Sequence, residues 1–296
     1  MPLFFPTVIR SRVPGLIENV RFLGTGRGVL ALAITFTITS AALRLGLSEN
    51  LLPDDAELII EARQLRGGYS EQPPLYSWML WTTFQLTGPG LVGLIVVRAA
   101  LLMTLAGLTY LSAQLLVADR RLVAVLAFSS LLLPAYGWHI ATYLTHSLLL
   151  GVAVMAMVYA VARIVRGGKA IDYVFLGGAV GVGALAKYNF PLVVASAIAA
   201  GLTVPAARRQ LLHPRMLISC AVATLVVSPH VVWLAGTWEE VVHLLRDKSN
   251  YASSPPYWIG VAEGLWAAAY CLLGCVFLIV PLLIWLGRGA AKIEPR

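Results

Sequence analysis

The chain has 296 residues, of which 59% are hydrophobic and only 12% charged, and its mean hydropathy is +0.80. That is more apolar surface than a water-soluble domain of this length can bury, so a soluble protein is excluded. The net charge of +8 is carried by short loops between apolar runs, which is how membrane proteins fix their orientation. We therefore expect no nucleic-acid partner.

The apolar runs have the length of membrane-spanning helices. A helix needs about 20 residues to cross the hydrocarbon core, whereas the strands of a membrane barrel alternate over about 10 residues. The predicted fold is all-α, a polytopic bundle with about eight spans, at residues 28–46, 91–117, 122–138, 147–165, 173–187, 190–206, 216–235 and 264–286. The three cysteines, Cys220, Cys271 and Cys275, fall inside these runs and predict neither a disulfide framework nor a metal site.

Eight crossings place both ends of the chain on one side. Most of the 22 Lys and Arg residues fall on that side, so it is expected to be the cytoplasm of a bacterial inner membrane. Residues 1–27 and 287–296 are then a cytoplasmic segment and tail around a membrane domain at 28–286. The outer side receives most of the 14 acids, in residues 47–90, 139–146, 187–190 and 236–263. Residues 75–90 are apolar but short, and we expect a helix at the outer interface.

The outer loop 47–90 contains a polar stretch, PDDAELIIEARQLRGGYSEQPPLYSW, at residues 53–78. Asp54 follows a proline and precedes Glu57 by three residues, so one interpretation is a carboxylate that caps a short amphipathic helix. The other interpretation is a catalytic acid, because a segment this polar between membrane spans is where chemistry would take place.

The pattern as a whole resembles the GT-C membrane glycosyltransferases related to bacterial aminoarabinose transferase and the protein O-mannosyltransferases. That family shows Asp-Glu-Ala followed by Gly-Tyr-x-x-His-Pro-Pro-Leu, and this chain has Asp54-Asp55-Ala56 and Gly68-Tyr69-Ser70-Glu71-Gln72-Pro73-Pro74-Leu75. Further on, Ala186-Lys187-Tyr188 is similar to the family's Ser-Lys-Tyr, and Ser228-Pro229 with Trp233 is similar to its Ser-Pro-x-x-x-Trp. The resemblance covers positions from about 54 to 238.

The resemblance implies transfer of a sugar from a polyprenyl-phosphate donor to a lipid, glycan or protein acceptor at the outer face of the membrane. Such a reaction needs a base for the acceptor's proton and a cation for the departing phosphate. Asp54 is expected to be the base, with Asp55 assisting by positioning or by binding a divalent cation; no other cofactor is expected. Lys187 and Arg98 are expected at the donor phosphate, although a snorkelling lysine and an arginine paired with a loop acid are the plainer alternatives.

Four residues are expected to contact substrate: Tyr69, Glu71, His146 and Tyr188. His146 stands in Leu144-Thr145-His146-Ser147, where the family usually has Thr-Pro-Asp, and is expected to position the acceptor. A metal site at the histidines is not expected, because their spacing follows no ligand motif.

The alternative function is a protein of the same fold that binds or transports a polyprenyl lipid without transferring its sugar. His146 in place of the family's acid favours this alternative. A small-solute transporter is a third alternative, for which the sequence shows neither an inverted repeat nor charged residues in the middle of a span.

Overall fold

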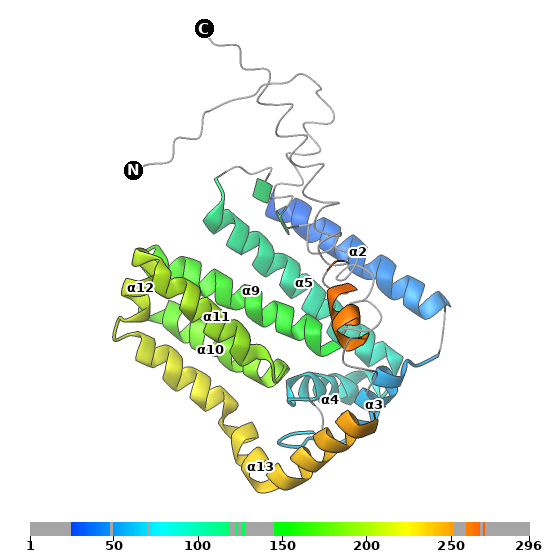
Figure 1. Ribbon diagram of the computed structural model, residues 1–296. Helices are drawn as coiled ribbons and strands as arrows, with labels where there is room; N and C mark the ends of the chain where they lie inside the picture. Colours follow the sequence, from blue (N-terminus) through cyan, green and yellow to red (C-terminus); the bar gives the residue numbers. More distant parts are fainter. Residues whose placement is uncertain are drawn as a thin grey trace, which may run out of the picture.

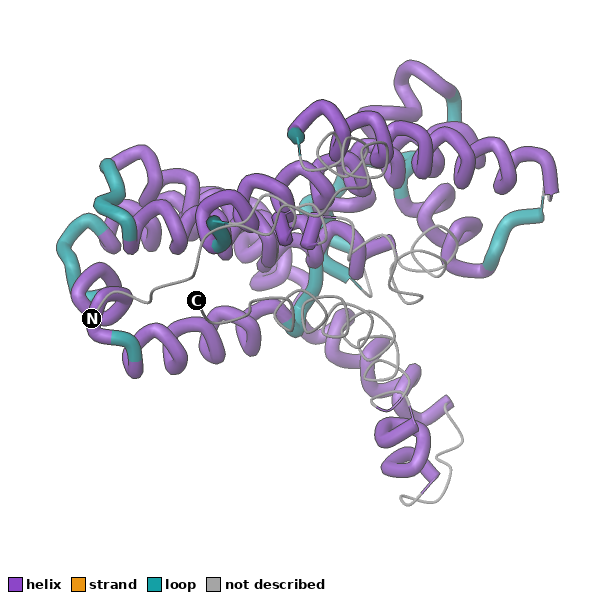
Figure 2. The backbone as a smooth tube through the Cα atoms, turned by 90° about the horizontal axis from the view of Figure 1, so that it is seen from above, coloured by secondary structure: helices purple, strands orange, loops and turns teal. Residues whose placement is uncertain are grey.

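The computed structural model describes residues 25–47, 50–69, 72–118, 122–123, 126–127, 145–251, 259–266 and 269. These residues form helices joined by loops, with no strand among them, which confirms the predicted all-α class (Figures 1 and 2). The predicted spans 122–138 and 264–286 lie mostly outside the described residues, as does the segment 1–27, and the tail 287–296 lies wholly outside them.

Five of the predicted spans begin and end within three residues of an observed helix. These helices are α2 (Gly26–Leu47), α5 (Leu91–Leu116), α9 (Thr145–Val165), α10 (Ala170–Ala186) and α11 (Phe190–Thr203). Among the described helices, four segments are long and apolar enough to cross a membrane: Gly26–Gly46, Leu91–Leu116, Thr145–Val165 and Met216–His243. Large apolar side chains stay exposed on α11, such as Leu192 at 70%. This is the surface of a membrane protein, where lipid replaces water.

The last long helix, α13 (Met216–Tyr251), continues past the predicted end of its span at residue 235. It contains Pro229 in its interior, which removes one backbone hydrogen bond and favours a kink. Figure 1 shows α13 changing direction and running back toward α3 (Pro53–Glu61). The sequence predicted a loop after residue 235, because the segment becomes polar there. The helix nevertheless continues to Tyr251, since a helix that is not packed inside the bundle does not need apolar residues along its whole length.

Two glycines let α10 and α13 approach each other closely. A Cβ atom on Gly177 would lie 2.5 Å from the Ser219 carbonyl oxygen, and one on Gly181 would lie 2.6 Å from the Val226 Cβ. Their spacing of four residues puts both on one face of α10, which is the small-xxx-small arrangement of membrane helix pairs. The Ser219 hydroxyl donates to the Tyr173 carbonyl at 2.7 Å and adds a polar contact between the same two helices.

Replacing Gly181 with alanine should therefore destabilise the protein by about 1–3 kcal/mol, the usual cost of overpacking. Gly178 is the matched control on the same helix, because no atom lies within 4 Å of the Cβ it would gain. Gly178→Ala should be neutral or slightly stabilising, since alanine has the higher helix propensity. Thermal unfolding of the detergent-purified variants measures both, and equal losses would argue against close α10–α13 packing.

The short helix α4 (Leu75–Thr87) contacts α5, α9 and α10. Its 13 residues are too few to cross a bilayer, which agrees with the prediction that residues 75–90 are not a span. Its buried side chains, among them Tyr76, Leu80 and Phe84, belong to the same apolar core as Leu58 and Ile59 of α3. Both short helices are thus anchored on the long ones.

The two ends of the bundle differ in chemistry. One end carries basic residues at the α9–α10 turn, on α12 (Pro205–Leu211) and before α13: Arg163, Arg166, Lys169, Arg208, Arg209 and Arg215. The Arg215 guanidinium donates to the Gly168 carbonyl at 3.3 Å, and the Tyr173 hydroxyl donates to Gln210 at 2.8 Å, so these segments meet. The sequence assigned all six basic residues to one side of the membrane. The other end is formed by α3, α4, the start of α9 and the α10–α11 turn.

Candidate functional site

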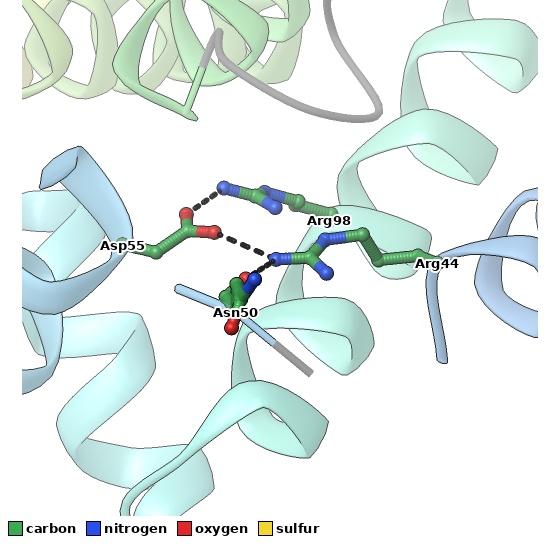
Figure 3. A network of polar contacts seen from close by, with 4 residues as sticks. All are labelled: Arg44, Asn50, Asp55 and Arg98. Carbon is green, nitrogen blue, oxygen red and sulfur yellow. Dashed lines mark hydrogen bonds and ion pairs between the residues drawn. The ribbon is translucent and has the colours of Figure 1, made fainter. Parts of the chain in front are cut away.

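A buried ion pair joins α3 to α2 and α5 (Figure 3). The Asp55 carboxylate, 0% exposed, accepts a short hydrogen bond from Arg98, which is 4% exposed. Its second oxygen lies 3.6 Å from a guanidinium nitrogen of Arg44, and that nitrogen also donates to the Asn50 carbonyl at 2.7 Å. The plainer sequence alternative for Arg98, pairing with a loop acid, is what the structure contains.

Asp54 lies beside this pair but in a different environment. Its side chain is exposed in the first turn of α3, where the positive end of the helix dipole favours an anion. The predicted capping role is wrong, because the N-cap residue is Leu52 and no side chain caps the helix. Pro53 occupies the first turn and lacks the N–H that a cap would satisfy. Asp54 thus makes no capping hydrogen bond at the start of the helix.

Tyr76 connects the ion pair to His146. Its ring is fully buried and lies 5.2 Å from the His146 ring, centroid to centroid. Burial raises the pKa of Tyr76 to about 12, while the nearby Arg98 acts in the opposite direction. The phenol therefore stays protonated at neutral pH. Its hydroxyl, Nε and Nη1 of Arg98, and Nδ1 of His146 are buried without a hydrogen-bond partner among the described residues.

Lys187 lies at the turn between α10 and α11, directly after the last helical residue of α10. Its ammonium donates to the Ser147 hydroxyl at 2.9 Å, so the turn is tied to the first residues of α9. The neighbour of Ser147 is His146, whose ring packs against that of Tyr76 on α4. These contacts fix one cation at the same end of the bundle as Asp54 and Asp55.

His230, which the sequence analysis did not assign to the site, holds three segments together. Its Nδ1 lies 3.0 Å from the Gly67 carbonyl oxygen and its Nε2 lies 3.4 Å from the Tyr188 hydroxyl. The imidazole also stacks on Trp233, with ring centroids 5.6 Å apart. Because His230 follows Pro229, the kink in α13 aims this side chain at the loop after α3. The family-like Ser228-Pro229 pair was the available signal.

Two of the other predicted substrate residues, Tyr69 and Tyr188, lie near His230 and its neighbour Trp233. Tyr69 is buried, and its hydroxyl donates to the Gln64 carbonyl at 2.7 Å; burial raises its pKa. Tyr188 is 39% exposed beside Lys187. Glu71 lies outside the described residues.

The structure thus gathers most of the predicted residues at one end of the bundle, in two adjoining groups. The first group runs from Asp55 through Arg98, Tyr76 and His146 to Lys187 and Ser147. The second comprises Tyr69, Tyr188, His230 and Trp233. Among the described residues, no three His, Cys, Asp or Glu side chains cluster as metal ligands would. For Asp55, the two guanidinium partners favour the positioning role over the cation-binding role.

Comparison with known proteins finds relatives among the glycosyltransferases. Two lipopolysaccharide core galacturonosyltransferases from Rhizobium johnstonii are similar to most of the chain. RgtB is 29% identical to it over 252 residues, and RgtA is 30% identical over 255 residues. The alignments cover 85% and 86% of this chain but 51% and 50% of the relatives, so the chain spans about half of their length. None of the solved structures matches the chain.

The family model described as dolichyl-phosphate-mannose-protein mannosyltransferase matches residues 71–233. That range is more than half of the chain and contains Tyr76, Arg98, His146, Lys187 and His230, the residues that link the site. It also ends at Trp233. The chain therefore belongs to the dolichyl-phosphate-mannose-protein mannosyltransferase family of GT-C glycosyltransferases.

Proposed function

We propose that this protein transfers a sugar from a polyprenyl-phosphate donor to an acceptor at the outer face of the bacterial inner membrane, with both termini in the cytoplasm. Membership of a glycosyltransferase family supports the reaction class. The observation that carries the proposal is the position of Lys187, a cation held at the end of the bundle that also presents the exposed carboxylate of Asp54.

The reaction needs one proton transfer and one exchange of bonds at the anomeric carbon. The Asp54 carboxylate takes the proton from an acceptor hydroxyl, whose oxygen attacks the anomeric carbon of the donor sugar. The bond between that carbon and the phosphate oxygen breaks, and polyprenyl phosphate leaves with the bonding electrons. Lys187 stabilises the negative charge that grows on the phosphate, as a point charge.

Arg98 and Asp55 are proposed to position Asp54 rather than to contact the substrate. Their buried pair fixes the start of α3 on α5, and α3 carries Asp54 in the preceding residue. Tyr69, Glu71, His146 and Tyr188 remain the proposed substrate contacts, with Tyr188 next to the phosphate-binding lysine. None of these steps requires a divalent cation, so transfer should be measured both with and without added divalent cations.

The relatives' names supply the first substrates to test. RgtA and RgtB are lipopolysaccharide core galacturonosyltransferases, so we propose galacturonate and a lipopolysaccharide core as the first sugar and acceptor, with a mannosyl donor beside them. The purified protein would be incubated with a labelled polyprenyl-phosphate sugar and the acceptor. A transferase releases free polyprenyl phosphate and labels the acceptor. A lipid carrier, the alternative function, binds the donor and releases neither product.

Replacing Lys187 with glutamine should raise the KM for the polyprenyl donor and lower kcat, because the cation at the phosphate is lost. We expect kcat/KM to fall at least about 10-fold, equal to 1.4 kcal/mol of transition-state stabilisation. Lys169→Gln is the matched control, since Lys169 lies at the opposite end of the bundle. Initial rates over a range of donor concentrations measure both variants. If Lys187→Gln matched the control, the lysine would be only an anchor at the end of a span.

A further inference from the structure

A cleft of about 490 Å³ lies between the end of α3, the loop that follows it and the second half of α13. Its lining includes Tyr69 and Trp233 together with four ionisable side chains, Glu61, Arg63, Arg66 and Glu240. We call it the Trp233 cleft. Its volume is in the range of sites that bind small organic ligands. It is lined by residues of α3, of the following loop and of α13, whereas the Asp55 pair joins α3 to α2 and α5 (Figure 3).

Close packing and hydrogen bonds fix the wall of the Trp233 cleft. A Cβ atom on Gly67 or Gly68 would lie 2.7 Å or 2.1 Å from Trp233 atoms, so this backbone lies directly against the indole. His230 contacts the Gly67 carbonyl and stacks on Trp233, which fixes the loop to α13 across more than 160 residues of sequence. The Trp78 indole donates to the Arg66 carbonyl at 2.7 Å and holds the other side of the loop. A preorganised wall lowers the entropic cost of binding.

The lining combines aromatic side chains with polar groups that donate hydrogen bonds and polar groups that accept them. Arg63 and Arg66 are hydrogen-bond donors only, and carboxylates such as Glu240 are acceptors only. A sugar hydroxyl is both donor and acceptor, and the apolar C–H face of a pyranose ring packs on aromatic side chains. The two arginines and two glutamates balance in charge, which favours a polyhydroxylated ligand over a polyphosphate.

We propose that the Trp233 cleft binds the glycan of the acceptor, with Arg63 and Glu240 as the side chains that hydrogen-bond its hydroxyl groups. The identification of this glycan as an acceptor rests on the proposed function. Its position favours that role. Trp233 in the lining stacks on His230, and Nε2 of His230 lies 3.4 Å from the hydroxyl of Tyr188, the residue that follows the proposed phosphate-binding Lys187.

The test is equilibrium binding of core oligosaccharide released from lipopolysaccharide to the full chain in lipid nanodiscs, without donor. Because no donor is present, no turnover contributes. Arg63→Ala and Glu240→Ala should each raise Kd at least about 10-fold. Glu239→Ala is the matched control, because Glu239 is the exposed neighbour of Glu240 on α13 and does not line the cleft. Unchanged Kd for the control and size-exclusion profiles equal to the parent would show that the fold is kept.

Three results would overturn this inference: no binding by the parent, equal Kd values for all variants, or the same loss in Glu239→Ala as in Glu240→Ala. The outcome is separable from that of the proposed function. Cleft-dependent binding together with no donor cleavage by the wild-type chain would refute the transferase and keep the glycan site. Donor cleavage together with glycan binding that is unchanged by the cleft substitutions would support the transferase and refute the glycan site.

Discussion

Replacing Asp54 with asparagine should lower the rate of glycosyl transfer by about 10²–10⁴-fold, which is the usual contribution of a positioned general base. Asparagine has nearly the same shape as aspartate but does not accept the acceptor's proton. Because the Asp54 side chain is exposed and caps no helix, the variant should insert and fold like the wild type. Turnover of a labelled polyprenyl-phosphate sugar gives the rate, and thermal unfolding gives the stability.

Glu57→Gln is the matched control for this substitution. Glu57 is an exposed acid on the same short helix, three residues further on, so the change in charge is equal. The control should retain wild-type turnover. If Asp54→Asn kept full activity, or if both variants lost activity equally, the assignment of Asp54 as the base would be wrong.

The neighbouring substitution, Asp55→Asn, should act on stability. It leaves the buried Arg98 guanidinium without its anionic partner, and breaking a buried ion pair in this way typically costs about 3–5 kcal/mol. Arg44 loses an ion-pair contact at the same time. We expect a large drop in the unfolding temperature of the detergent-purified protein.

A second variant separates this pair from a general effect of mutating α3. Asp55→Asn combined with Arg98→Met should cost less than the sum of the single substitutions, because the unpaired charge is removed along with its partner. Additive losses would mean that Asp55 and Arg98 stabilise the protein independently. The two adjacent aspartates thus have different expected effects: substitution of Asp54 should lower the transfer rate, and substitution of Asp55 should lower the stability of the fold.

The long helices could be predicted from the sequence because apolar length is a strong signal. α5 begins at Leu91 as predicted and ends at Leu116, one residue before the predicted boundary. The end of α13 was not predictable in this way. The segment after residue 235 contains Glu239, Glu240, Arg246 and Asp247. Hydropathy does not distinguish a loop from a helix that continues through such a polar segment.

The candidate site could be predicted only in part. Asp54, Asp55 and Lys187 stood out because they occupy positions that resemble the family's motifs, and Arg98 because a charge inside an apolar run is costly. Tyr76 and His230 did not, since a tyrosine and a histidine near the ends of apolar segments are ordinary interface residues. Their roles depend on contacts between positions far apart in the chain, such as His230 with Gly67. A single sequence does not contain that pairing.

The most direct test of the account is a structure of the Asp54→Asn protein with a bound polyprenyl-phosphate sugar. It should place the donor phosphate within hydrogen-bond distance of the Lys187 ammonium, with the anomeric carbon facing residue 54 and the polyprenyl chain leaving toward the lipid. A donor whose phosphate lies at the basic end of the bundle, near Lys169 and Arg215, would contradict the account.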